Sequence, residues 1–234
     1  MRIQIFQHVH FEGPGHIETW AIEHGHTFLV TKLYNDDPLP DLDDVDALVV
    51  MGGPMGIYDD HRYPWLRKEK SFLLDFIETK KPIIGICLGS QLIAHVLRTP
   101  VYRNREPELG WFPVYFTAGS DPVVDKFNER TIDVFHWHRD AFDLPYGATK
   151  LAESNATQVQ MYLLDRHILG ILCHLEMSPN AIEKLLENAR SDLADGGTFV
   201  QNEKKIIELS SEKCEATKIV LFRLLDRFFE IAKL

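Results

Sequence analysis

The chain has 234 residues, 45% of them hydrophobic and 26% charged, which is the balance of an ordinary folded domain. Its formal net charge of −10 argues against nucleic acid or an anionic membrane surface as the main partner, because both attract clustered Lys and Arg. The three cysteines form no close pair, which is typical of a reduced, cytoplasmic protein rather than of a disulfide-bonded secreted one.

The first half of the chain alternates short apolar runs with helical patterns. The expected strands are residues 2–6, 28–33, 47–51 and 82–86, and the expected helices are 15–24, 63–79 and 90–97. Strands separated by helices predict an α/β fold, with a mostly parallel sheet flanked by helices on both faces.

The second half is richer in strands. These are expected at residues 110–116, 132–137, 149–153, 159–164 and 168–173, followed by helices at 179–193 and 212–233. An apolar stripe along the last helix predicts packing against the core. Because no repeat or linker interrupts the pattern, we expect a single domain over 1–234, with a catalytic core at about 48–179 and C-terminal helices at 179–234.

A cysteine stands at the junction of an expected strand and an expected helix. Cys87 is flanked by Gly85 and Gly89, the small neighbours that a sharp, strained nucleophile turn requires. The start of the helix would favour the thiolate, and the N–H of Leu88 would face an oxyanion. The motif alone leaves open a small buried cysteine in a glycine-rich turn.

Two further segments carry the partners that such a cysteine needs. His174 and Glu176 end an expected strand, where their spacing places both side chains on one face, so that the carboxylate can orient the imidazole. By itself this pattern also fits a surface histidine at a strand end. The turn Gly52-Gly53-Pro54 follows a buried strand and offers free N–H groups, although alone it is only a tight turn.

Together these motifs resemble the class I glutamine amidotransferases, whose pattern has a Gly-Gly-Pro loop, a G-x-C-x-G-x-Q turn and a late H-P-E, in that order. Three further stretches are similar to the glutaminase domain of GMP synthetase and its stand-alone relatives. These are residues 108–111 (E-L-G-W), 135–140 (F-H-W-H-R-D) and 147–152 (G-A-T-K-L-A). The resemblance runs from about residue 48 to 179.

The resemblance implies a doubly wound, flavodoxin-like fold and a γ-glutamyl thioester intermediate. It makes Cys87 the nucleophile, His174 the base and then the acid, and Glu176 the residue that orients His174. The backbone N–H groups of Gly53 and Leu88 would form the oxyanion hole. The residues implied to bind substrate are Gln91, Trp137, His138 and Arg139.

Two residues depart from the family pattern. Leu175 replaces the usual proline, which should alter rigidity more than chemistry. Arg139 stands where many relatives carry glycine, and it could narrow the pocket or reach a substrate carboxylate. The ATP-using signature of GMP synthetase and the Walker motif are both missing from this sequence. Released ammonia would therefore pass to a separate synthetase subunit, or the thioester would pass to water or an amine.

Three functions remain open at this point. The first is a glutaminase or amidotransferase whose ammonia acceptor is unidentified, the second a γ-glutamyl peptidase or hydrolase, and the third a regulatory protein without catalysis. No cofactor or metal is expected, because the histidines lack a typical zinc-ligand pattern. Hydrogen-bonded or solvated side chains are the simpler interpretation of His8, His10, His16, His24, His26, His136 and His138, although the last two are candidates to line the site.

Overall fold

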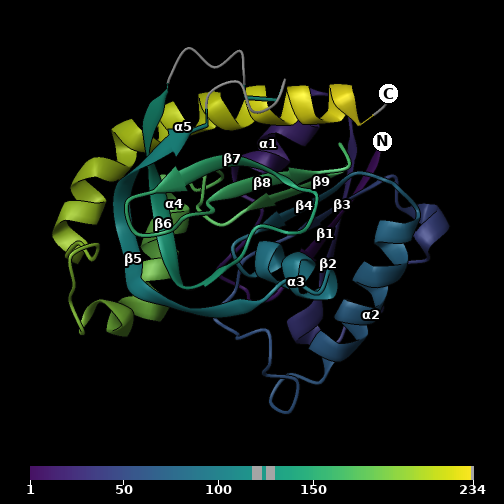
Figure 1. The fold of residues 1–234 in the computed structure, drawn as a ribbon, viewed down its shortest axis with the longest axis horizontal. Helices are drawn as coiled ribbons and strands as arrows, with labels where there is room; N and C mark the ends of the chain where they lie inside the picture. The colour runs from purple at the N-terminus through teal and green to yellow at the C-terminus, as the bar shows by residue number, and fades with distance from the viewer. Residues whose placement is uncertain (118–122, 125–129, 233–234) are drawn as a thin grey trace.

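A computed structural model of the protein describes residues 1–117, 123–124 and 130–232. Its centre is a nine-stranded sheet in the order β2-β1-β3-β4-β9-β8-β7-β5-β6, with helices on both faces (Figure 1). The strand order and the flanking helices confirm the predicted α/β class. One half of the sheet is parallel and the other antiparallel, so the sheet is more mixed than the first half of the sequence suggests.

The parallel half agrees with the sequence to within a few residues at each end. Its strands are β1 (Arg2–Gln7), β2 (Thr27–Lys32), β3 (Ala47–Val50), β4 (Ile83–Ile86) and β9 (Ile168–Ile171). The helices and 3-10 turns that connect the first four strands are α1 (His16–Glu23), η1 (Leu33–Asn35), η2 (Leu42–Asp44) and α2 (Trp65–Glu78), and α3 (Leu88–Val96) follows β4.

Strand β3 shows why this half was predictable. All four of its residues are buried, since helices cover both faces of the sheet. Ala47 and Val49 pack into the cluster that contains residues of α1 and of the C-terminal helix α5 (Glu203–Ile231). Leu48 and Val50 pack on the opposite face, with α2 and α3. Successive side chains of this apolar strand therefore point to opposite faces of the sheet and pack into two different cores.

The antiparallel half contains the largest departures from the sequence predictions. Its strands are β5 (Val101–Phe116), β6 (Thr131–Phe142), β7 (Thr149–Ser154) and β8 (Met161–Leu164). Strand β5 begins well before the predicted residue 110, and β6 runs past the predicted end at 137. The early part of β5 is polar, and its pairing with β6 shifts register between Arg103 and Glu108. Because of that irregularity, the sequence of β5 lacks the regular alternation of apolar and polar residues that predicts a strand.

The C-terminal segment supplies two helices that cover the sheet. Helix α4 (Pro179–Ala189) is capped by the Ser178 hydroxyl, which accepts from the N–H of Ala181, and it continues into the 3-10 turn η3 (Arg190–Leu193). Helix α5 starts earlier than the predicted residue 212, because Asn202 caps a first stretch that is rich in charge. The predicted last residue of that helix, Lys233, lies outside the described residues. None of the described helices is both long and apolar enough to cross a membrane.

Candidate active site

Cys87 lies in the turn between β4 and α3 and has the backbone geometry that its motif predicts. Its φ of 47° and ψ of −107° are strained for a residue with a side chain. A Cβ on Gly85 would lie 2.6 Å from the carbonyl of Gly89, and a Cβ on Gly89 would lie 2.0 Å from the carbonyl oxygen of Val50. Both glycines are therefore required by close packing around the turn.

His174 and Glu176 are brought together as their spacing predicts, but not by a regular strand. The Nδ1 of His174 lies 2.7 Å from Oε1 of Glu176, and both side chains are buried. Strand β9 ends at Ile171, and the segment beyond it is held by an isolated bridge in which the N–H of His174 donates to the carbonyl of Phe135 at 2.8 Å. The expected strand to residue 173 is thus too long, and β6 does part of the positioning.

The imidazole of His174 and the thiol of Cys87 border the same small space. A Cβ built on Gly52 would lie 3.4 Å from Cε1 of His174 and 3.5 Å from Cβ of Cys87. The thiol also approaches the carbonyl of Trp137, at 3.7 Å. Burial lowers the pKa of His174, but the charge of Glu176 and the contact with Cys87 outweigh it and raise the pKa well above its usual value. His174 can therefore take and hold a proton.

A buried ion pair holds the turn that contains Gly52. Nδ1 of His8 lies 3.0 Å from the carbonyl oxygen of Gly52, and its Nε2 lies 2.9 Å from Oε1 of Glu69. Since both ring nitrogens face acceptors, both carry protons. Burial lowers the pKa of His8, but Glu69 and Gly52 outweigh it and raise it. Sequence reasoning missed this pair, although Glu69 stands at helical spacing on the buried face of α2.

The two residues whose N–H groups are assigned to the oxyanion hole lie in contact with each other. A Cβ on Gly53 would lie 3.2 Å from Cδ2 of Leu88. Leu88 is the first residue of α3, where a backbone N–H has no partner within its own helix. Within the described ranges, neither N–H donates a hydrogen bond, so both are available to an oxyanion.

A cavity of about 370 Å³ opens beside Cys87. Every residue that the sequence analysis assigned to substrate binding lines this cavity. The cavity is lined among others by Glu12, Gly53, Cys87, Gln91, Arg103, Trp137, His138, Arg139 and Asp140. Glu12 was not predicted to belong to the site, because it precedes the resemblance and stands in a loop without a chemical motif.

One wall of the cavity is made by β6 and the turn after α4. The indole Nε1 of Trp137 donates to Oδ2 of Asp192 at 3.2 Å. The guanidinium of Arg139 donates to the backbone carbonyl of Asp192 and lies 3.3 Å from Oδ2 of Asp195. Arg139 is therefore already bound to protein groups, and it closes the pocket on this side.

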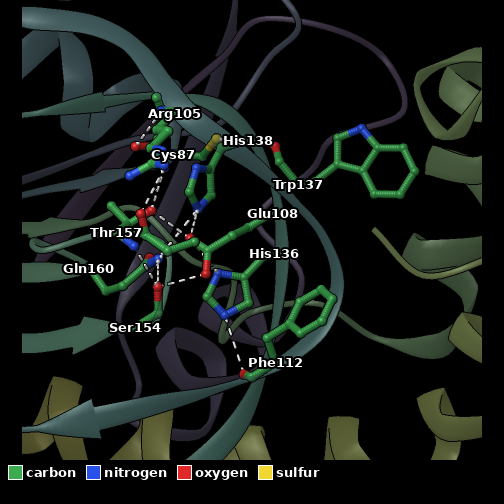
Figure 2. Close-up of polar contacts among 12 residues, drawn as sticks. Cys87, Arg105, Glu108, Phe112, His136, Trp137, His138, Ser154, Thr157 and Gln160 are labelled. Atoms are coloured by element: carbon green, nitrogen blue, oxygen red, sulfur yellow. Dashed lines mark hydrogen bonds and ion pairs between the residues drawn. The ribbon is translucent and has the colours of Figure 1, made fainter. Parts of the chain in front are cut away.

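His138 borders the cavity, but its side chain and that of His136, the alternate residues of β6, are directed into a buried polar network (Figure 2). Its centre is Glu108, whose Oε1 accepts from Ser154 at 2.6 Å, and whose Oε2 accepts from Thr157 at 2.6 Å and from Gln160 at 2.7 Å. Nε2 of His138 lies 3.3 Å from the same Oε2. Burial raises the pKa of Glu108, but these donors and the neighbouring imidazoles outweigh it and lower the pKa to about 2. Figure 2 shows Trp137 directed away from this network.

His136 completes the network on the side away from the cavity. Its Nε2 lies 3.3 Å from the carbonyl of Phe112, and its Nδ1 lies 3.9 Å from Glu108. Burial lowers its pKa to about 4, so the ring is neutral. Ligand atoms of Glu108, His136 and His138 lie within 4.8 Å of one another. The carboxylate oxygens, however, already accept from protein donors, which a cation would have to displace. The arrangement fits a hydrogen-bonded support for β6 better than a metal centre.

Comparison with known proteins places the chain in a family. Residues 21–191 match the family described as glutamine amidotransferase class-I. The glutamine amidotransferase-like protein YfeJ of Salmonella typhimurium is 31% identical over 234 residues, which cover 97% of this chain and 96% of that protein. A glutamine amidotransferase from Thermotoga maritima has a similar structure, with a TM-score of 0.89, 28% identity and 98% of each chain covered.

Two more distant relatives differ in the activity that their names state. A glutamine-hydrolyzing GMP synthase component of Saccharolobus solfataricus is 31% identical over 142 residues, 60% of this chain and 72% of that protein. Gamma-glutamyl peptidase 4 of Arabidopsis thaliana is 26% identical over 183 residues, 76% of this chain and 70% of that protein. Family match, fold and relatives agree: the chain belongs to the class I glutamine amidotransferases.

Proposed function

We propose that the protein hydrolyses the side-chain amide of glutamine through a γ-glutamyl thioester on Cys87. The observation that carries this proposal is the buried 2.7 Å contact between His174 and Glu176, beside the strained turn that holds the thiol. An oriented base next to a cysteine at a helix start is the arrangement that nucleophilic catalysis needs.

The residues of the proposed site divide the steps of the reaction among them. Nε2 of His174 takes the thiol proton, and the Cys87 sulfur attacks the amide carbon of the substrate. The N–H groups of Gly53 and Leu88 stabilise the oxyanion. His174 then gives its proton to the leaving nitrogen, and Glu176 holds the imidazole in the orientation that both transfers require. Water then gives a proton to His174 and attacks the thioester carbon, the carbon–sulfur bond breaks with its electron pair on sulfur, glutamate leaves, and His174 returns the proton to the Cys87 thiolate.

Substrate binding falls to the cavity wall beside the nucleophile. We assign the amino-acid end of the substrate to Gln91 and to the β6 segment Trp137, His138 and Arg139, all of which line the cavity with Cys87. The ammonia would go to a separate synthetase subunit, or to another acceptor that is still unidentified. The relative named as one component of a GMP synthase supports such a partner. All three cysteines are free thiols, which supports a reducing, cytoplasmic location.

A second candidate function is a γ-glutamyl peptidase that cleaves larger conjugates. The cavity favours it, since it continues from Cys87 to Arg103 and Asp140, and its volume of about 370 Å³ lies in the range of sites for ligands larger than a free amino acid. The similarity to a gamma-glutamyl peptidase points the same way. A regulatory role without catalysis is the third candidate, and the complete set of Cys87, His174 and Glu176 argues against it.

Turnover of glutamine beside γ-glutamyl-cysteinyl-glycine tests these alternatives, with Cys87→Ala as the blank. Ammonia released from glutamine alone would support a glutaminase, and the next step would be a search for its synthetase. Cleavage of the peptide would support a γ-glutamyl hydrolase. Turnover that survives in Cys87→Ala would overturn the proposed nucleophile, and an absence of labelling at Cys87 by a glutamine-like electrophile would favour the regulatory role.

A further inference from the structure

Glu12 is a carboxyl group in the cavity to which the mechanism above gives no role. It lies in the loop between β1 and α1 and lines the cavity together with Cys87. A Cβ built on Gly52 would lie 2.6 Å from Oε2 of Glu12, and the same point is 3.4 Å from Cε1 of His174 and 3.5 Å from Cβ of Cys87. The carboxyl group therefore borders the space between the base and the nucleophile.

The loop that carries Glu12 is bound to the catalytic segments at both of its ends. At one end, His8 contacts the carbonyl of Gly52 at 3.0 Å. At the other, the N–H of His16 donates to the carbonyl of Glu176 at 2.8 Å. Gly15 has a φ of 52°, and a Cβ there would lie 2.1 Å from the same carbonyl, so only glycine permits this approach. The loop therefore holds Glu12 in a defined position beside the proposed catalytic residues.

The Glu12 carboxyl group makes no hydrogen bond or salt bridge within the part of the chain that the structure describes. Although Glu12 is only half-buried and its carboxyl group opens to the cavity, desolvation by the surrounding protein raises its pKa to about 7, against the opposing influence of His174 and His8, and Glu176 raises it further. The other charged groups that line the cavity are Arg103, Arg139, Asp140 and Asp192. Near neutral pH the group therefore holds a proton in a substantial share of molecules.

We propose that Glu12 is a second proton donor, which protonates the amine released from the substrate and holds it as an ammonium ion. This inference rests on the proposed function, since it needs the thioester on Cys87. First, His174 gives its proton to the amide nitrogen. The carbon–nitrogen bond breaks, its electron pair stays on nitrogen, and the carbon–sulfur bond of the thioester remains.

The released amine is still neutral at this stage and can attack the thioester again. The Glu12 carboxyl then gives its proton to the nitrogen lone pair, which leaves an ammonium ion beside a carboxylate. An ammonium ion has no lone pair with which to reverse the acylation. The carboxylate is reprotonated from solvent through the open cavity as the ammonium leaves. Glu12 would thus favour hydrolysis over return to the amide, and it suits release of the ammonium ion to solvent rather than transfer of neutral ammonia to a synthetase.

Two substrates with different leaving groups test this role in Glu12→Gln. Ammonia from glutamine is basic enough to be trapped by a proton, whereas the p-nitroaniline of γ-glutamyl-p-nitroanilide is too weak a base to hold one near neutral pH. We expect kcat/KM to fall at least about tenfold for glutamine and less than about twofold for the anilide, since one proton-transfer group contributes at least this much. Glu187→Gln, which removes an exposed carboxyl group of α4 outside the cavity, is the matched control.

The pH profile gives an independent readout. The glutamine rate of the wild-type protein should decline as pH rises through about 7, as Glu12 loses its proton, and Glu12→Gln should lack that decline. Equal losses on both substrates, or no loss on either, would overturn the role of Glu12. A wild-type protein that turns over neither substrate in a Cys87-dependent way would instead refute the proposed function on which this role rests.

Discussion

The two halves of the sheet prepare the site in different ways. In the parallel half, strands that are apolar on both faces lead into tight turns, and the backbone of those turns places Cys87 and the proposed oxyanion donors. In the antiparallel half, the wall of the cavity depends on a buried carboxylate, Glu108, and the donors gathered around it. The comparison teaches that loss of Cys87 should stop the reaction with little change in stability, whereas replacement of Glu108 should lower the stability of the protein.

The largest effect is expected at Cys87, the proposed nucleophile. Cys87→Ala should lower kcat/KM by about 10⁴-fold or more, because the covalent route is lost and only binding and oxyanion stabilisation remain. Thermal unfolding should be unchanged, since the side chain is small and its strain is in the backbone. A marked loss of stability in this variant would contradict the proposed contrast between the two halves.

The next largest effects should distinguish the proposed base, His174, from Glu176, the residue proposed to orient it. His174→Ala should lower the rate about 10³-fold or more, and Glu176→Ala should cost clearly less, since the base still acts in part without the residue that orients it. Steady-state kinetics of the two purified variants, each checked for native circular dichroism, measure the difference. A greater loss in Glu176→Ala would show that the roles are wrongly assigned.

In the antiparallel half, Glu108→Gln should destabilise the protein by about 2–4 kcal/mol, because an amide cannot accept from all the donors that face the carboxylate. Since the pKa of Glu108 is lowered to about 2, its contribution is present above its unfolded pKa and is lost as pH falls through about 2. Urea unfolding at neutral pH measures the loss. Ser154→Ala, which removes a single donor, should cost only about 1 kcal/mol.

The buried ion pair under the Gly52 turn gives a smaller and pH-dependent effect in the parallel half. Glu69→Gln should destabilise the protein by about 2 kcal/mol, less than the full cost of an unpaired buried charge, because the amide can still accept from His8. The folded pKa of His8 is raised, so the stabilisation is complete below the unfolded pKa and is lost as pH rises through the folded value. Unfolding free energies of both proteins from pH 6 upward would show whether their difference shrinks in alkali.

The predicted features of the site depend mainly on residues that are close in the sequence, whereas the missed features depend on residues that are far apart in it. The strained turn at Cys87 was predictable, because the glycines that permit it stand two residues away on either side, although the group that approaches Gly89 is Val50 of β3. The contact of His174 with Glu176 was predictable from a spacing of two residues, although a bridge to Phe135 rather than a regular strand produces it. The early start of β5 was missed, because an irregular pairing with β6 replaces the alternation that marks a strand.

By itself, then, the sequence determined the α/β class, the three motifs and their order along the chain, since local backbone needs and period-two burial act over a few neighbouring residues. Only the tertiary structure decided the order of nine strands, the partners of Glu108 and the approach of His8 and Glu12 to the Gly52 turn. The physical reason is that a buried polar side chain must find partners, but those partners come from distant segments. The residue type shows that a partner is required, but the fold alone determines which group becomes that partner.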